Sequence, residues 1–212
     1  MKVLALTLGF DERFAVRAMM RGGISSGDRI VVFMAEPVEE RASRCLQVVR
    51  EFLSRYVRDV EFRVLKVDVG RFEEAVSRIR RGLQEAVRGA EEVVLNLSGG
   101  MRALILEVLS AALLLGLDCM VEVELENLTG VVSFPIRLLR ASKLSRGDLE
   151  ILSRLLKTGG WVSLSELSRV SKMPRSTVHK RLRRLIEIGL VESKRVGRRV
   201  IYRASEWAGV YI

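Results

Sequence analysis

The chain has 212 residues, 49% of them hydrophobic and 29% charged, with a formal net charge of +10, and this length suits one ordinary domain and one small one. Its apolar stretches are shorter than a membrane span, and the N-terminus MKVLALTLGFDE meets an acidic pair before any signal-peptide cleavage sequence, so we expect a cytoplasmic protein without a membrane partner. Two cysteines without CxxC spacing and a single histidine argue against a metal site.

Short apolar runs alternate with helical patterns in residues 1–136. Runs rich in Val, Ile and Leu, typical of strands buried on both faces, occupy residues 2–8, 29–35, 61–67 and 92–97. Helical patterns occupy 38–53, 71–89 and 101–117, and the last is apolar nearly all round, which predicts the most buried helix. Two further runs, 120–125 and 131–134, flank a hairpin-like turn. The pattern predicts an α/β domain with a Rossmann-like, mostly parallel sheet, helices on both faces and a hairpin at one edge.

The loops after the first and fourth predicted strands are the candidate ligand site. Ligands of such sheets bind beyond the carboxyl ends of the strands, where strand order reverses, and these two strands are the usual neighbours there. The loops contain neither GxxxxGK[ST] nor GxGxxG. Two glycines, Ser98 and Arg102 gather at a predicted helix N-terminus, an arrangement that favours an anion. An ordinary βα turn, with glycines needed for packing, remains the alternative.

The entire charge excess lies in the last third of the chain. Residues 1–141 hold 20 basic and 20 acidic residues, whereas residues 142–212 hold 16 basic and 6 acidic ones. After a linker at 137–144, residues 145–212 show three helical patterns, which begin at Ser145, Ser163 and Pro174. Two strand patterns, 190–193 and 200–203, then flank a basic segment. This order predicts a winged helix-turn-helix domain that binds double-stranded DNA.

The third helix of this domain is expected to enter the major groove, and the basic hairpin to contact phosphates or the minor groove. We expect Arg175 to pair with guanine, while Ser176 and Thr177 contact phosphates. Protein contacts in place of DNA contacts are the alternative use of this domain. The predicted DNA-binding residues are Arg175, Ser176, Thr177, His179, Lys180, Arg183, Arg184, Lys194, Arg195, Arg198 and Arg199.

The loops TLGFDE and NLSGGMR, together with the block SLSELSRVSKMPRSTVHKRLRRLIEIGLVESK, resemble archaeal CRISPR-associated transcriptional regulators. These proteins join a CARF domain, a CRISPR-associated Rossmann-fold sensor, to a winged helix. The resemblance implies a homodimer whose paired CARF domains, residues 1–136 here, bind a cyclic oligoadenylate, cyclic tetra-adenylate in particular, across the two-fold axis. The matching ligand-binding positions are Thr7, Gly9, Phe10, Glu12, Asn96, Ser98, Gly99, Gly100, Met101 and Arg102.

Two of these positions have a second interpretation. Phe10 stacks on a base or is a core or interface aromatic, and Asn96 binds ligand or braces the loop. The resulting hypothesis is a dimeric DNA-binding regulator of CRISPR-Cas genes, gated by the cyclic oligoadenylate second messenger, with no cofactor and no enzymatic activity. The alternatives are a ring nuclease, in which the 2′-hydroxyl of the ligand itself attacks, and a CRISPR-associated scaffold protein. The candidate loops contain no histidine or lysine for acid–base catalysis.

Overall fold

The computed structural model describes residues 1–140 and 144–212 of the chain. These residues divide into two units, Met1–Ile136 and Arg137–Ile212, and each unit is described by itself.

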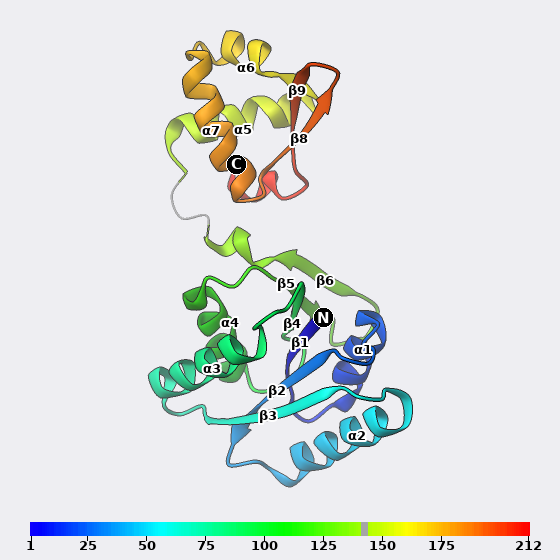
Figure 1. Ribbon diagram of the computed structural model, residues 1–212. Helices are drawn as coiled ribbons and strands as arrows, with labels where there is room; N and C mark the ends of the chain where they lie inside the picture. Colours follow the sequence, from blue (N-terminus) through cyan, green and yellow to red (C-terminus); the bar gives the residue numbers. More distant parts are fainter. Residues whose placement is uncertain (141–143) are drawn as a thin grey trace. The chain divides into compact units, whose positions relative to one another are not determined.

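A six-stranded sheet is the central layer of the first unit (Figure 1). Its order is β3-β2-β1-β4-β5-β6, in which β1 to β5 run parallel and β6 pairs antiparallel with β5. The strands are β1 (Lys2–Thr7), β2 (Arg29–Glu36), β3 (Glu61–Asp68), β4 (Glu92–Asn96), β5 (Met120–Glu124) and β6 (Val131–Pro135). The predicted Rossmann-like fold with an edge hairpin is confirmed, and β1 lies beside β4 as expected.

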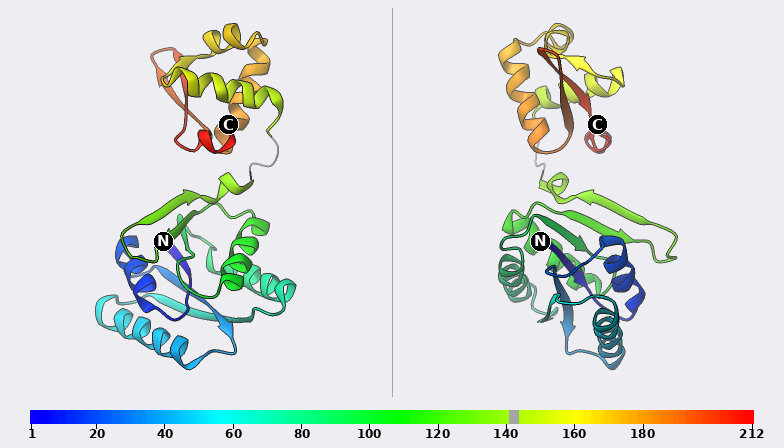
Figure 2. Two further views of the ribbon diagram at one scale, coloured as in Figure 1. Left: turned by 180° about the vertical axis from the view of Figure 1, so that it is seen from behind. Right: turned by 45° about the vertical axis from the view of Figure 1, so that its right-hand side comes forward.

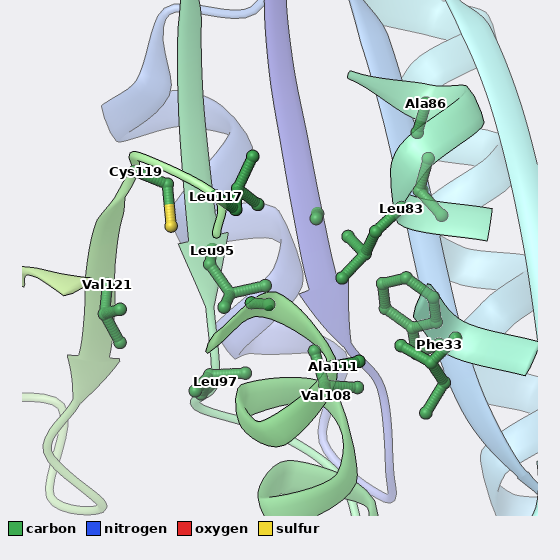
Figure 3. Close-up of a cluster of buried hydrophobic side chains, with 14 of the residues drawn as sticks. Phe33, Leu83, Ala86, Leu95, Leu97, Val108, Ala111, Leu117, Cys119 and Val121 are labelled. Atoms are coloured by element: carbon green, nitrogen blue, oxygen red, sulfur yellow. The ribbon is translucent and has the colours of Figure 1, made fainter. Parts of the chain in front are cut away.

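Helices cover both faces of this sheet (Figures 1 and 2). They are α1 (Glu12–Gly22), α2 (Glu40–Tyr56), α3 (Phe72–Ala86) and α4 (Arg102–Leu115). Side chains of β2 alternate between two buried clusters: Ile30 and Val32 face the cluster that includes residues of α1 and α2, whereas Phe33 faces the cluster with α3 and α4. Figure 3 shows this second cluster, in which Phe33 lies near Leu83 and Val108.

Helix α4, the helix expected to be most buried, still exposes two leucine side chains. Leu106 is 58% exposed and Leu114 68% exposed, because the sheet and α3 cover the other side of the helix. Glu107, in contrast, is fully buried, and neither carboxylate oxygen has a hydrogen-bond partner among the described residues. Burial, and secondarily the nearby charge of Asp68, raise the pKa of Glu107 to about 7.

Three helices and a three-stranded sheet form the second unit (Figure 1). The unit begins within a short 3-10 helix, and the sheet order is β7-β9-β8. The elements are η1 (Ile136–Arg140), α5 (Arg146–Thr158), β7 (Val162–Ser163), α6 (Leu164–Ser171), α7 (Arg175–Glu187), β8 (Val191–Val196), β9 (Arg199–Ala204) and η2 (Ala208–Tyr211). The predicted winged helix-turn-helix is confirmed, with β8 and β9 as the wing.

Three local predictions differ from the structure. The linker expected at 137–144 begins inside η1, and its residues 141–143 lie outside the described part of the chain. The basic segment expected between the last two strands belongs mostly to those strands: Val196 pairs with Arg199, which leaves a turn of Gly197 and Arg198. The two-residue strand β7 was not predicted, because its sequence is too short to show a period. Within the described residues, every helix is too short or too polar to cross a membrane.

Candidate ligand site and nucleic-acid interface

The loops that follow β1 and β4 pack directly against each other through their glycines. A side-chain carbon at Gly9 would lie 2.6 Å from the backbone nitrogen of Gly100, and one at Gly99 would lie 2.9 Å from the carbonyl oxygen of Thr7. Gly100 also has a φ of +91°, a conformation that residues with side chains rarely adopt. The close approach that these glycines permit is therefore, first of all, between the two loops.

Two other predicted site residues hold the second loop in place. The amide oxygen of Asn96, which is buried, accepts a hydrogen bond from the backbone nitrogen of Ser98 at 3.3 Å. The Ser98 hydroxyl in turn accepts one from the backbone nitrogen of Glu124 at 2.8 Å. Thr7 is buried at the end of β1, and its hydroxyl has no hydrogen-bond partner among the described residues. Asn96 and Ser98 thus brace the β4–α4 loop against β5.

Helix α1 begins within the first candidate loop. Its N-cap, Asp11, accepts hydrogen bonds from the backbone and side chain of Arg13, and the bond from the Arg13 side chain is the main reason that the pKa of Asp11 lies below its usual value. In the next position, Glu12 accepts a hydrogen bond from the buried Cys45 thiol at 3.3 Å. Burial and the Glu12 carboxylate raise the pKa of this thiol, which favours its protonated form.

The remaining predicted ligand residues are exposed at the same edge of the sheet. Phe10 is 41% exposed and Met101 47% exposed, and the exposed side chain of Arg102 makes no hydrogen bond or ion pair with a described residue. Two adjacent surface hollows join the loops. One hollow is lined by Leu8, Gly9, Phe10, Ala35, Pro37, Glu39, Ala42, Gly100 and Met101. The other is lined by Phe10, Asp11, Phe14, Arg41, Ser98, Gly99, Gly100 and Glu126.

The sequence interpretation missed Arg41 and Glu126, which line the second hollow from α2 and from the β5–β6 turn. For Arg41 a local signal exists, because a cation in the first turn of a helix opposes the positive end of the helix dipole. Glu126 gives no such signal, since its place depends on how the hairpin lies beside β4.

The third helix of the second unit presents basic side chains to solvent. Pro174, expected at the first helical position, is instead the N-cap residue of α7. The inner side of α7 buries Val178, Leu182 and Leu185. A broad hollow between α7 and the start of α5 is lined by Ser145, Asp148, Thr177, His179, Lys180, Arg181, Arg183, Arg184 and Glu187. The predicted DNA contacts on α7 are exposed, apart from the half-buried Thr177.

A buried carboxylate ties α7 to α5. Asp148 completes the capping box of α5 with Ser145 and is 1% exposed. It pairs with Arg181 at 3.0 Å and with Arg184 at 3.3 Å, so one predicted DNA contact, Arg184, is also bound within the protein. A side-chain carbon at Gly147 would lie 2.5 Å from the Arg181 guanidinium carbon, which explains the glycine inside this first turn. Sequence analysis recognised the cap but not the two ion pairs.

The wing is anchored on an aromatic ring. The ammonium of Lys194 lies 4.2 Å from the ring centroid of Trp161, and the guanidinium of Arg203 lies 4.9 Å from it. Arg203 also pairs with Glu192 across the β8–β9 ladder at 2.6 Å. Arg198 and Arg199, by contrast, are exposed at and beside the turn, and their side chains make no hydrogen bond or ion pair with the described residues.

Comparison with known proteins gives both units a family. Residues 2–135 match the Csa3 CRISPR-associated Rossmann-like domain, which is more than half of the chain. The chain belongs to the Csa3 family. Residues 144–192 match the winged helix-turn-helix DNA-binding family. The order of the two domains in this Csa3 chain confirms the resemblance to CRISPR-associated regulators that the loop and helix sequences indicated.

Two curated relatives carry the name "CRISPR locus-related putative DNA-binding protein Csa3". The one from Thermoproteus tenax is 31% identical, over 90% of this chain and 85% of its own. The one from Saccharolobus solfataricus is 24% identical, over 94% of this chain and 84% of its own.

Similar solved structures match a third of this chain. A homodimeric winged helix-turn-helix DNA-binding domain from Mycobacterium bovis is 28% identical, with a TM-score of 0.31, over 35% of this chain and 68% of its own. The zinc-responsive MarR family member ZitR from Lactococcus lactis is 25% identical, with a TM-score of 0.30, over 33% of this chain and 49% of its own. This chain thus spans about half the length of ZitR.

Proposed function

We propose that the chain is a transcriptional regulator of CRISPR-Cas genes that binds double-stranded DNA through α7 and the wing. The observation that carries the proposal is the set of exposed basic side chains on these two elements, within a segment that holds 16 basic and 6 acidic residues. Neutralising DNA phosphates with such side chains releases counterions, which drives binding. The N-terminal residues of α7, Arg175 and Ser176 among them, are the ones that a recognition helix directs at base edges.

The regulator acts as a homodimer in this proposal. Leu106 is exposed on α4, and Leu109 and Leu113, which share its side of the helix, are partly buried. A second copy of the chain that covers this side would remove these side chains from water. Two winged helices on one dimer would then read two half-sites of a palindromic operator.

The proposed ligand is a cyclic oligoadenylate, cyclic tetra-adenylate in particular, held between two copies of the first unit. Three features support an aromatic, anionic ligand: the exposed ring of Phe10, the exposed guanidinium of Arg102, and the N-terminus of α4 beside it. A dimer presents each of these twice, which suits a two-fold ring of phosphates. Binding of the cyclic oligoadenylate changes the affinity of the protein for its operator if the ligand has different affinities for the DNA-bound and DNA-free conformations of the dimer.

DNA and ligand binding can be tested together. The full chain is titrated with a duplex from a CRISPR-locus promoter and with a scrambled duplex, each with and without cyclic tetra-adenylate, while sedimentation gives the oligomeric state. We expect a dimer that prefers the promoter duplex, with an affinity that the ring changes. Equal or undetectable binding of both duplexes at low salt would contradict the regulator and favour the scaffold.

Chromatography of the recovered ring distinguishes the regulator from a ring nuclease. We expect intact cyclic tetra-adenylate after prolonged incubation with the protein. A linear product, formed at a rate proportional to protein concentration, would show that the chain cleaves its ligand. Two of the polar side chains in the loops, Ser98 and Glu12, already bond within the protein, to Glu124 and Cys45.

A further inference from the structure

Arg41 reaches from α2 to the first candidate loop and holds it at two points. Its Nε donates a hydrogen bond to the carbonyl oxygen of Phe10 at 3.1 Å. Its guanidinium carbon also lies 5.7 Å from the centroid of the Phe10 ring. The exposed aromatic ring and the exposed arginine thus lie together, although 31 positions separate them in the chain.

The contacts to Phe10 use only part of the guanidinium. Among the described residues, the two terminal nitrogens of Arg41 have no hydrogen-bond or ion-pair partner. The side chain lies in the first turn of α2, where a cation opposes the helix dipole, so the helix itself gains nothing from it. An exposed planar group whose two terminal nitrogens have no partner among the described residues suits bidentate recognition of a phosphate.

The surroundings of Arg41 match the proposed ligand site. Arg41 lines the same hollow as Phe10, Ser98 and Gly100, so α2 contributes to a site otherwise built from the loops after β1 and β4. Arg102, at the start of α4, is a second exposed guanidinium without a partner among the described residues. The two cations come from different elements that both begin at the carboxyl edge of the sheet.

We infer that Arg41 is a further ligand-binding residue, which takes one phosphate of the anionic ligand with its terminal nitrogens while its Nε keeps Phe10 in position. The inference rests on the proposed function, because it assigns a contact within that ligand site. The ligand site then includes a residue of α2 in addition to those of the two loops. Arg41 provides a positive charge for the phosphate and also orients the Phe10 ring.

The test measures the affinity of the full chain for cyclic tetra-adenylate by calorimetry. We expect Arg41→Gln to weaken binding roughly tenfold or more, as the loss of a charge-assisted contact does. Arg41→Lys keeps the charge but not the planar guanidinium group, so its affinity should lie between those of Arg41→Gln and the unchanged protein. Arg50→Gln is the matched control: Arg50 is on the same helix and its guanidinium lies 5.8 Å from the ring of Phe62, outside the hollow. We expect this control to bind like the unchanged protein.

Salt dependence distinguishes a phosphate contact from a purely structural role. If Arg41 contacts phosphate, ligand affinity of the Arg41→Gln variant falls less steeply with salt than that of the unchanged protein. Parallel salt curves, or unchanged affinity in both Arg41 variants, would overturn the inference and leave the ligand proposal intact. Absence of binding by the unchanged protein, in contrast, would overturn the ligand proposal and this inference with it.

Discussion

Gly9 and Gly100 lie so close that a side-chain carbon on Gly9 would be 2.7 Å from the Cα of Gly100. The nearest atoms to such a carbon, the nitrogen and Cα of Gly100, belong to the backbone, so no flexible side chain can yield. The contact joins the loops after β1 and β4, the two strands at which strand order reverses. The candidate ligand site therefore depends on a contact that any side chain at Gly9 disrupts.

We expect Gly9→Ala to lower the free energy of unfolding by about 1–3 kcal/mol, as overpacking does elsewhere. Differential scanning calorimetry of the full chain measures it. Gly22→Ala is the control, since a side-chain carbon there would meet Ile24 at an ordinary 3.8 Å, and it should leave stability unchanged or slightly raised, as alanine favours a helix. Equal melting temperatures for the two variants would show that the loops separate without penalty.

The buried carboxyl of Glu107 makes stability depend on pH. Its pKa is raised to about 7, above the value near 4.5 expected when the chain is unfolded. Ionisation therefore favours the unfolded chain, and stability is lost as pH rises from about 4.5 to 7. We expect Glu107→Gln to be neutral near pH 4 and to stabilise the protein by about 3 kcal/mol at pH 8. Chemical denaturation across this range measures the difference, and Glu73→Gln, at an exposed position on α3, is the control. A constant difference at all pH values would contradict the assignment.

The strand and helix order, the edge hairpin and the winged helix could be predicted because apolar residues repeat with the period of each element. Val178, Leu182 and Leu185 show this well, since their spacing alone places them on the inner side of α7. The period says nothing about which polar side chain is buried. Glu107 is buried because of neighbours from other elements, so its sequence context does not separate it from a surface carboxylate. The position of Asp148 three residues after Ser145 indicates a helix cap, but its ion pairs depend on α7.

In the candidate ligand site, too, some residues could be predicted from the sequence and others only from the structure. The glycines and Arg102 could be found because they follow strands in a motif, and the motif also implied Phe10. Arg41 has only a local signal, its unfavourable place in the first turn of a helix, because its relation to Phe10 exists only once α1 and α2 pack side by side on the sheet. From the sequence, the glycine pair permits a close approach either to a ligand or to a neighbouring element of the fold. The structure shows the approach to a neighbouring element, the other loop, and the hollow beside the loops leaves room for a ligand.

Asp148 should stabilise the second unit at neutral pH. Burial opposes its ionisation, but hydrogen bonds from Ser145 and Arg181 outweigh burial and keep the pKa of Asp148 below its usual value. This contribution is present above the pKa of the unfolded chain and is lost as pH falls through the lowered pKa. We expect Asp148→Asn to destabilise the unit by about 3–5 kcal/mol at pH 7, and by less below pH 4.

Tryptophan fluorescence can follow this change specifically, because both tryptophans, Trp161 and Trp207, belong to the second unit. Glu150→Gln is the matched control on the same helix. Glu150 pairs with Arg154 at 3.9 Å and its side chain is 41% exposed, so its loss should have little effect. Similar denaturation curves for the two variants would mean that the Asp148 ion pairs contribute nothing measurable.

The recognition helix should carry sequence preference. Arg175 is exposed in the first turn of α7, where side chains reach base edges. We expect Arg175→Ala to narrow the difference in binding free energy between promoter and scrambled duplex by about 1–3 kcal/mol. Lys180→Ala should have the same kind of effect if Lys180 also reaches a base. A uniform loss on both duplexes would make these residues phosphate contacts instead.

The wing should carry affinity without sequence preference. Arg198 lies in the two-residue turn between β8 and β9, exposed and without a partner among the described residues, so it is available to a phosphate. Arg203, on the same hairpin, is already paired with Glu192 and lies over Trp161.

We expect Arg198→Ala to weaken binding to promoter and scrambled duplexes alike, and to lower the slope of log affinity against log salt by about one per contact and protomer. Arg203→Ala should leave that slope nearly unchanged, because the Arg203 guanidinium is held within the wing. The measurement is a salt series of binding isotherms for both variants, and equal slopes for Arg198→Ala and the unchanged protein would remove the wing tip from the DNA interface.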